Sequence, residues 1–261
     1  MELSMEKKIV FIAGADHSGS TLLGCILGAH YESPFKYIHV GEIHAFFDVN
    51  KKNYGNSKLA RNSFYGKIWD EINHEVGYQN AYKEIFEKTE ADIIIDSSKT
   101  DRNLNIAEQA CLESNYSMHI IISFRPFAKI LQSDLRGNKS QKYILTNLSR
   151  YFDIKNKFVD KHCPYTIVNI EDLILDPRKM TIKLCQEVNI PYFEGKENYW
   201  NYPSCHLYGS KTQRLHLNNP STAGYDKEKV LAKPDISHPF LEREDVLELE
   251  KFFLENSLKP E

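Results

Sequence analysis

The chain has 261 residues, and its 33 Lys and Arg residues against 36 Asp and Glu residues give a formal net charge of −3. This balance provides no basic field for nucleic acid, so we expect no nucleic-acid partner. No apolar run approaches the roughly 20 residues that cross a membrane, and the charged residues before 9–13 do not form a secretion signal. We therefore expect a soluble, cytoplasmic protein with no membrane partner and a single domain over residues 1–261.

The five cysteines are scattered along the chain, and no two of them form a C-x-x-C pair. This spacing argues against a zinc site and against a disulfide framework. Free thiols in a reducing compartment are the expected state of these side chains.

Short apolar segments alternate along the chain with segments of helical periodicity. The predicted strands are residues 9–13, 37–40, 91–96, 118–124 and 165–170. The predicted helices include a pair broken near Gly77, one over 141–160, one that starts at Asp176 and Pro177, and a last one over 241–254. The alternation predicts an α/β fold, a P-loop-containing parallel sheet of about five strands flanked by helices. Ligands of such sheets bind beyond the carboxyl ends of the strands.

The segment from Gly14 to Thr21 lies between the first predicted strand and the helix that follows. It fits the phosphate-binding template G-x-x-x-x-G-K-[ST] at every fixed position but one, because Ser20 stands where the template has lysine. A glycine loop at a helix start directs backbone N–H groups at an anion. Two glycines at the template spacing favour a phosphate site over an ordinary tight turn. His17, at the apex of the loop, could donate a hydrogen bond to an oxygen between two anionic groups.

A second candidate site follows the fourth predicted strand. Arg125 comes directly after that strand, Ser133 is eight residues further on, and Arg136 lies beyond. A strand-end arginine is often a surface ion-pairing residue. Because arginine is also a natural bidentate ligand of a phosphate monoester, this group of residues predicts a second anion pocket.

Residues 195–235 are rich in tyrosine, glycine and proline and show no clear period. Ser210, Lys211 and Arg214 combine two cations with a hydroxyl and could close over a nucleotide, although a solvated loop fits the pattern equally well. The aromatic residues of this region and the polar segment 50–66 could wall an acceptor pocket, and core packing is the alternative for the aromatic residues.

These motifs resemble those of sulfotransferases that use 3′-phosphoadenosine 5′-phosphosulfate (PAPS). Residues 17–23, His-Ser-Gly-Ser-Thr-Leu-Leu, resemble the family's 5′-phosphosulfate loop [RK]-S-G-[ST]-T-L-L, with histidine in place of the usual basic residue. Arg125 and Ser133 have the spacing of the family's 3′-phosphate motif. Residues 168–191 resemble its Y-E-D-L…P…L-C…L-G-[IL]-P segment, and 209–214 resemble more loosely a late nucleotide-contacting loop.

Residues 27–30 and 40–42 are also similar to bacterial and tyrosylprotein sulfotransferases, in which the glutamate of a G-E pair is the general base. The resemblance implies transfer of a sulfuryl group from PAPS to a hydroxyl or amine of a small-molecule acceptor by in-line displacement. Adenosine 3′,5′-bisphosphate (PAP) would be the product, and no metal would be required. Glu42 would be the general base, His17 would neutralise the leaving 5′-phosphate, and Lys99 would stabilise the sulfuryl oxygens.

The nucleotide-binding residues implied by the resemblance are His17, Ser18, Gly19, Ser20, Thr21, Arg125, Ser133, Ser210, Lys211 and Arg214. Two other functions stay open. A phosphate-loop kinase or NTPase would use Mg²⁺ and Asp96, which ends an apolar run, and the missing lysine argues against it. A non-catalytic nucleotide-binding protein would keep the fold, and histidine at position 17 is its support. Both a monomer and a homodimer agree with the sequence.

Overall fold

Five parallel strands form the centre of the structure, a computed structural model that describes residues 6–30, 36–47, 68–159, 163–202, 204, 206, 209–210, 216, 221 and 224–260. The strands are β1 (Lys8–Gly14), β2 (Tyr37–Gly41), β3 (Ile93–Lys99), β4 (Ser117–Phe124) and β5 (Tyr165–Asn169), in the order β2-β3-β1-β4-β5. All five predicted strands and the α/β architecture are confirmed. The third strand begins later than predicted and continues beyond Asp96 to Lys99.

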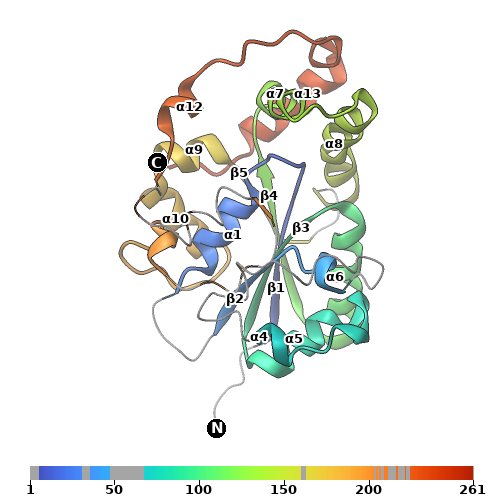
Figure 1. Ribbon diagram of the computed structural model, residues 1–261, viewed down its shortest axis with the longest axis vertical. Helices are drawn as coiled ribbons and strands as arrows, with labels where there is room; N and C mark the ends of the chain where they lie inside the picture. The colour runs from blue at the N-terminus through green and yellow to red at the C-terminus, as the bar shows by residue number, and fades with distance from the viewer. Residues whose placement is uncertain are drawn as a thin grey trace.

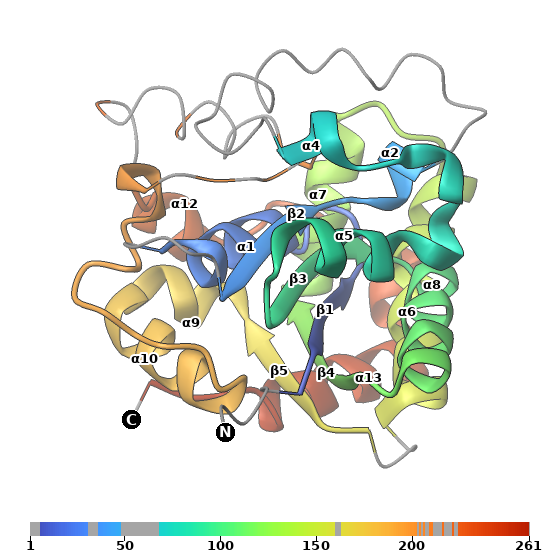
Figure 2. The ribbon, with the colours of Figure 1, turned by 90° about the horizontal axis from the view of Figure 1, so that it is seen from below.

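Helices cover both faces of this sheet (Figures 1 and 2). On one side lie α1 (Ser20–Gly28), α9 (Ile170–Leu175) and α10 (Pro177–Glu187), and on the other lie α5 (Ala81–Thr89), α6 (Asp101–Ser114), α8 (Gln141–Ile154) and α13 (Glu244–Glu255). The remaining helices are α2 (His44–Phe47), α4 (Ile68–Glu71), α7 (Phe127–Arg136) and α12 (Lys227–Leu231).

The alternation of side chains along β1 explains why both faces are covered. Ile9 and Phe11 pack into the core under α5, α6, α8 and α13, whereas Val10 and Ile12 pack into the core under α1, α9 and α10. All four side chains have no exposed surface. A parallel strand that is apolar on both faces requires a helix layer on each side, and the continuous apolar run in the sequence reflects that requirement.

Helix α1 approaches β2 closely because two of its glycines face His39. A Cβ atom on Gly24 would lie 2.2 Å from His39 Nε2, and one on Gly28 would lie 2.3 Å from His39 Cβ. Since α1 begins directly after the glycine loop, this packing helps to fix the loop at the end of β1.

Some predicted helix boundaries differ from the observed ones. The helix predicted over 141–160 is α-helical only to Ile154 and continues as a π-helical turn. The last helix, predicted from residue 241, begins at Glu244 and follows a 3₁₀ turn over Pro239–Glu242. The break near Gly77 is confirmed, and Gly77 has a φ of +76°. The irregular segment 195–235 contains α12, which at five residues is too short to show a period. The predicted loop 50–66 lies outside the described residues.

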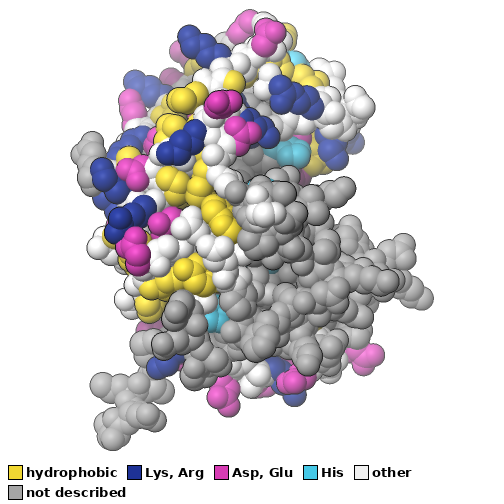
Figure 3. Space-filling model, turned by 60° about the vertical axis from the view of Figure 1, so that its left-hand side comes forward, with side chains coloured by type: hydrophobic (Ala, Val, Ile, Leu, Met, Phe, Trp, Pro, Cys, Tyr) yellow, Lys and Arg dark blue, Asp and Glu magenta, His cyan; other side chains and the backbone are white. Residues whose placement is uncertain are grey.

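Charged side chains of both signs are interspersed on the face shown in Figure 3, in line with the near-neutral net charge. Cys25, Cys111, Cys163 and Cys185 are free thiols, while Cys205 lies outside the described residues. Within the described part of the chain, no helix has the length and apolar character that crossing a bilayer requires.

Candidate functional site

A cleft of about 1080 Å³ opens at the carboxyl ends of the central strands. It is lined by most of the residues that the sequence predicts for the site, namely His17, Gly19, Ser20, Thr21, Glu42, Lys99, Arg125, Ser133 and Ser210. Ser18 is buried below the loop surface, and its side chain does not line the cleft. Lys211 and Arg214 lie outside the described residues. The location agrees with the general rule for ligands of open parallel sheets.

The phosphate loop brings the start of α1 to the cleft. Gly19, the residue before α1, has a φ of +91°, and a Cβ atom there would lie 2.7 Å from Ile170 Cγ1. Both the backbone conformation and the close approach therefore require glycine. The first turn of α1 holds no acidic side chain. Its backbone N–H groups, which have no partners within the helix, are thus available to an anion.

The tail of the chain reaches this helix start as well. The Ser210 N–H donates to Thr21 Oγ1 at 3.1 Å. A Cβ atom on Gly209 would lie 2.7 Å from the same hydroxyl oxygen, so the tail backbone passes close to α1. The sequence suggested that this tail could close over a nucleotide, and residues 209–210 do lie against the phosphate loop.

His17 is held at the loop apex by a buried carboxyl group. Its Nε2 atom lies 3.4 Å from Asp134 Oδ1, and Asp134 of α7 is fully buried. Asn147 Nδ2 donates to the other oxygen of Asp134 at 2.9 Å. Burial raises the pKa of Asp134, and Asn147 and His17 oppose that shift. The imidazole is itself 43% exposed, so Asp134 orients it at the edge of the cleft without removing it from solvent.

Arg125, the predicted second anion site, lies directly after β4 and lines the cleft. Among the described residues, no carboxylate lies within ion-pair distance of its guanidinium. The nearby carboxylate of Glu171 is engaged by Lys129, with Nζ 2.6 Å from Oε1. Burial lowers the pKa of Arg125, and the charge of Glu171 opposes this change. A partly buried cation without an ion-pair partner is costly, so this position would favour an anionic ligand.

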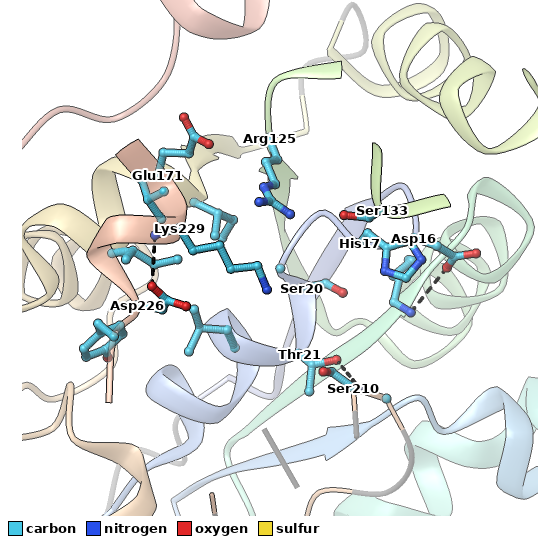
Figure 4. Close-up of a pocket in the computed structure, with 18 of the residues that line it drawn as sticks. Asp16, His17, Ser20, Thr21, Arg125, Ser133, Glu171, Ser210, Asp226 and Lys229 are labelled. Carbon is cyan, nitrogen blue, oxygen red and sulfur yellow. Dashed lines mark hydrogen bonds and ion pairs between the residues drawn. The ribbon is translucent and has the colours of Figure 1, made fainter. Parts of the chain in front are cut away.

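Ser133 lines the same cleft and lies in α7, the helix that follows Arg125 in the chain. Its hydroxyl donates to the Lys129 carbonyl at 2.9 Å. Figure 4 shows Arg125 and Ser133 near the glycine loop, with Ser20 between Arg125 and the lower part of the cleft.

A chain of charged groups spans the remaining side of the cleft. Lys99 Nζ lies 2.5 Å from Glu42 Oε1 and 3.5 Å from Asp16 Oδ1. Arg150 lies 3.3 Å from the other oxygen of Asp16, which also accepts a hydrogen bond from the Tyr143 hydroxyl. Burial acts to raise the pKa of Asp16, but Lys99, Tyr143 and Arg150 outweigh it, so this pKa lies below its usual value. The arrangement holds Lys99 between two carboxylates.

Asp96 does not face this cleft. It is fully buried, and it accepts hydrogen bonds from the Tyr82 hydroxyl at 2.6 Å, the Ser98 N–H at 2.8 Å and the Tyr78 hydroxyl at 3.4 Å. Burial raises the pKa of Asp96 to about 6. A carboxyl group held in this way is not placed to bind a magnesium ion beside the phosphate loop, so the kinase alternative gains no support from the geometry.

The fold also assembles a cluster of buried Cys25, His39 and His206, whose potential ligand atoms lie within 4.8 Å of one another. The rings of His39 and His206 are stacked, with centroids 4.7 Å apart and an interplanar angle of 28°. The nitrogen lone pairs of imidazole lie in the ring plane, so two stacked rings do not direct them at one ion. His39 Nε2 instead lies 3.2 Å from Ser97 Oγ. We assign this cluster to packing of the tail against α1 and β2.

Comparisons with known proteins identify the architecture. No protein-family model and no curated protein matches the sequence. Among solved structures, the sulfotransferase domain of the Synechococcus PCC 7002 olefin synthase is similar, with 19% identity, a TM-score of 0.61 and 97% of each chain covered. The sulfotransferase domain from the curacin biosynthetic pathway is similar with 15% identity and a TM-score of 0.65, over 98% of this chain and 100% of that one. The chain has a sulfotransferase-like fold.

This sulfotransferase-like fold hosts several cleft residues that the sequence did not single out. They are Asp16, Lys139, Tyr143, Glu171, Asp226 and Lys229, together with several apolar neighbours. Asp16 could have been found as the neighbour of His17 in the loop. Lys229 gave no signal, because it lies in a short helix within an irregular segment. Fold likeness alone does not assign an activity, so the function is argued from these side chains.

The aromatic residues of the tail divide between the cleft and the core. Tyr199 and Tyr225 line the cleft, although Tyr199 is 2% exposed. The rings of Trp200 and Tyr225 are tilted by 59° to each other, with centroids 5.5 Å apart. Tyr192, Trp200 and Tyr202 pack against the core under α1 and α10, and Tyr208 lies outside the described residues. Core packing is thus the main role of these rings.

Proposed function

We propose that this protein is a sulfotransferase that uses PAPS and an acceptor with a hydroxyl or amine group, with a small molecule as the acceptor class. One observation carries the proposal: the helix start after β1 and the guanidinium after the neighbouring strand β4, which has no ion-pair partner among the described residues, line the same cleft. A ligand with anionic groups at two separate positions satisfies both, and a ribose phosphorylated at its 3′ and 5′ positions has this form. The sulfotransferase-like fold supports the same choice.

The size of the cleft agrees with two bound molecules. Its volume of about 1080 Å³ lies just above the roughly 300–1,000 Å³ that is typical of ligand pockets. The nucleotide would occupy the part between the glycine loop and Arg125. The acceptor would then lie toward Glu42 and Lys99.

PAPS, when bound, supplies an activated sulfuryl group: its bond from sulfur to the bridging oxygen breaks, PAP leaves with the electron pair, and sulfur bonds to the acceptor atom. The chain's own groups would serve three tasks. The Glu42 carboxylate would take the proton from the acceptor, and the adjacent Lys99 ammonium would stabilise the sulfuryl oxygens. The backbone N–H groups at Gly19 and Ser20, with His17, would bind the 5′-phosphate and its developing charge.

This assignment also accounts for Ser20 at the position of the template lysine. A sulfuryl group carries less negative charge than a terminal phosphoryl group, so a lysine-and-magnesium clamp on it is less necessary. For the sulfuryl group, hydrogen-bond donors at the loop would then be the main requirement, and the backbone N–H groups at the start of α1 would supply them.

Calorimetry in the presence of a metal chelator tests the nucleotide. PAP should bind clearly more tightly than ATP, and ATP should gain little on adding Mg²⁺. Tight, magnesium-dependent binding of ATP with weak binding of PAP would contradict the proposal. A second assay follows the release of PAP from PAPS with a panel of phenols, alcohols and amines. PAP binding without transfer to any acceptor would instead favour a non-catalytic nucleotide-binding protein.

A further inference from the structure

Lys229 enters the cleft from a part of the chain that the motifs do not include. Figure 4 shows its side chain extending from α12 toward Ser20, with Arg125 on the same side and His17 beyond Ser20. All four side chains line the cleft. In that view the lysine points toward the residue that replaces lysine in the phosphate-binding template.

The position of Lys229 is set by contacts on both sides of it. The Asp226 carboxylate accepts a hydrogen bond from the Lys229 N–H at 2.9 Å and caps the helix. Lys227 Nζ donates to the Leu175 carbonyl at 2.8 Å, which fastens α12 to the end of α9. The buried ammonium of Lys129 donates to the Val230 carbonyl, which fastens α12 to α7. These contacts fix α12 on both sides of Lys229, whose own side chain lines the cleft.

Lys229 differs from the other lysines of the cleft in its partners. Lys99 is paired with Glu42 and Asp16, and Lys139 lies over the ring of Tyr143, 4.9 Å from the centroid. Within the described part of the chain, the Lys229 ammonium makes no ion pair or hydrogen bond. It thus resembles Arg125 in lining the cleft without an ion-pair partner among the described residues, although the Lys229 side chain is exposed and Arg125 is partly buried.

We propose that Lys229 supplies, from α12, the phosphate-binding cation that the loop lacks at Ser20, and that it contacts the 5′-phosphate of the nucleotide. The inference rests on the proposed function, which places a nucleotide in the cleft. In the template, the lysine reaches the phosphates from the helix start. A lysine that approaches the same helix start from outside delivers an equivalent charge to the same anion. Arg125 and Ser133 would then be left for the 3′-phosphate.

The test separates the two phosphates by calorimetry with PAP, adenosine 5′-monophosphate and adenosine 3′-monophosphate. The variants are Lys229→Gln, Lys229→Arg and Lys233→Gln, the last being a matched loss of charge at an exposed lysine that does not line the cleft. Lys229→Gln should weaken PAP and the 5′-monophosphate by roughly 10- to 100-fold, as expected for a lost hydrogen bond between charged groups. It should leave the 3′-monophosphate unchanged. Lys229→Arg should restore most of the affinity, and Lys233→Gln should bind as the wild type does.

The other outcomes are distinguishable. If the wild type binds PAP and Lys229→Gln binds it equally well, the assignment of Lys229 is overturned while the proposed function stands. A loss confined to the 3′-monophosphate would also overturn it, because Lys229 would then serve the site of Arg125. A wild type that does not bind PAP would overturn both proposals. Melting temperatures of all variants show whether a loss of affinity comes from a loss of folding.

Discussion

Lys99 Nζ lies 2.5 Å from Glu42 Oε1, so the end of β3 is tied to the turn after β2 at the cleft. The two residues are 57 positions apart in the chain, and they meet because β2 and β3 are paired in parallel. The ion pair holds the carboxylate of the proposed base in place, and it keeps the positive charge of Lys99 beside that carboxylate. In the proposed reaction, a proton transferred to Glu42 would weaken this ion pair, and Lys99, still beside Asp16, would become more available to the anionic oxygens of the transferred group.

The Glu42→Gln variant should lose turnover and keep its nucleotide. General-base catalysis contributes typically about 10²- to 10⁴-fold, so kcat should fall by at least about 100-fold. Glutamine retains the size of the side chain and an oxygen for Lys99, so PAP affinity should stay within a few-fold of the wild type. Release of PAP from PAPS with a reactive acceptor measures the first quantity, and calorimetry measures the second. Full activity would show that Glu42 is not the base, and Glu194→Gln, an exposed surface change, is the control.

The Arg125→Ala variant should weaken the binding of PAP by roughly 10- to 100-fold, because a charge-assisted contact to the 3′-phosphate is lost. Adenosine 5′-monophosphate, which lacks that phosphate, should bind the variant and the wild type alike. Titration calorimetry with both ligands provides the comparison. Arg178→Ala removes an exposed arginine from a surface pair with Glu194 and should change neither affinity. Equal binding of PAP by wild type and Arg125→Ala would refute this placement of the 3′-phosphate.

Asp96 should make the stability of the protein depend on pH. Its folded-state pKa of about 6 lies above the ordinary value of 3.8, because the carboxyl group is buried. The stability it contributes is therefore complete below the ordinary value and is lost as the pH rises through about 6. The Asp96→Asn variant has no titrating carboxyl group at this position, so it does not lose this stability as the pH rises. The free energy of unfolding of Asp96→Asn relative to the wild type should thus increase between pH 4.5 and 7.5, by on the order of 2 kcal/mol. Urea unfolding at several pH values measures it, and parallel pH curves would contradict it.

The Gly24→Ala variant should destabilise the protein although alanine favours helices. Alanine normally gains about 1 kcal/mol over glycine within a helix. At this position its Cβ would lie 2.2 Å from the ring of His39, which is buried, bonded to Ser97 and stacked on His206. Overpacking of this kind costs typically about 1–3 kcal/mol, so the clash outweighs the helix preference. Gly137→Ala is the matched control, because its Cβ would meet nothing closer than 3.4 Å. A melting temperature of Gly24→Ala at or above that of the wild type would contradict the packing.

The parts of the fold that the sequence predicted are those set by local patterns. The five strands follow from apolar runs that are buried on both faces, and the loop from Gly14 to Thr21 follows from a spacing of eight residues. The pairing of Glu42 with Lys99 needs the strand order, which no local pattern contains. The same holds for Asp134 beside His17, since His17 lies in the loop after β1 and Asp134 lies in α7, which follows β4.

Short sequence patterns missed one feature of the structure and suggested the wrong role for another. Helix α12 has five residues, fewer than two turns, so no periodicity could reveal it or the lysine it carries into the cleft. Asp96 follows an apolar run, as a magnesium-binding aspartate does, but the hydroxyl groups of Tyr78 and Tyr82 keep it in the interior. Those tyrosines precede β3 in the chain, and only the packed structure shows where they point.

His17 and Lys99 both have a φ of +67°, in the left-handed region that glycine tolerates best. The other described non-glycine residues with positive φ, namely Glu90, Asn115, Asn138 and Asn189, lie one or two residues after the end of a helix, where such a conformation is common. A left-handed L-residue costs about 1–2 kcal/mol. Selection for heat resistance alone would therefore favour glycine at positions 17 and 99. Directed evolution without an activity screen would be expected to replace these two cleft side chains early.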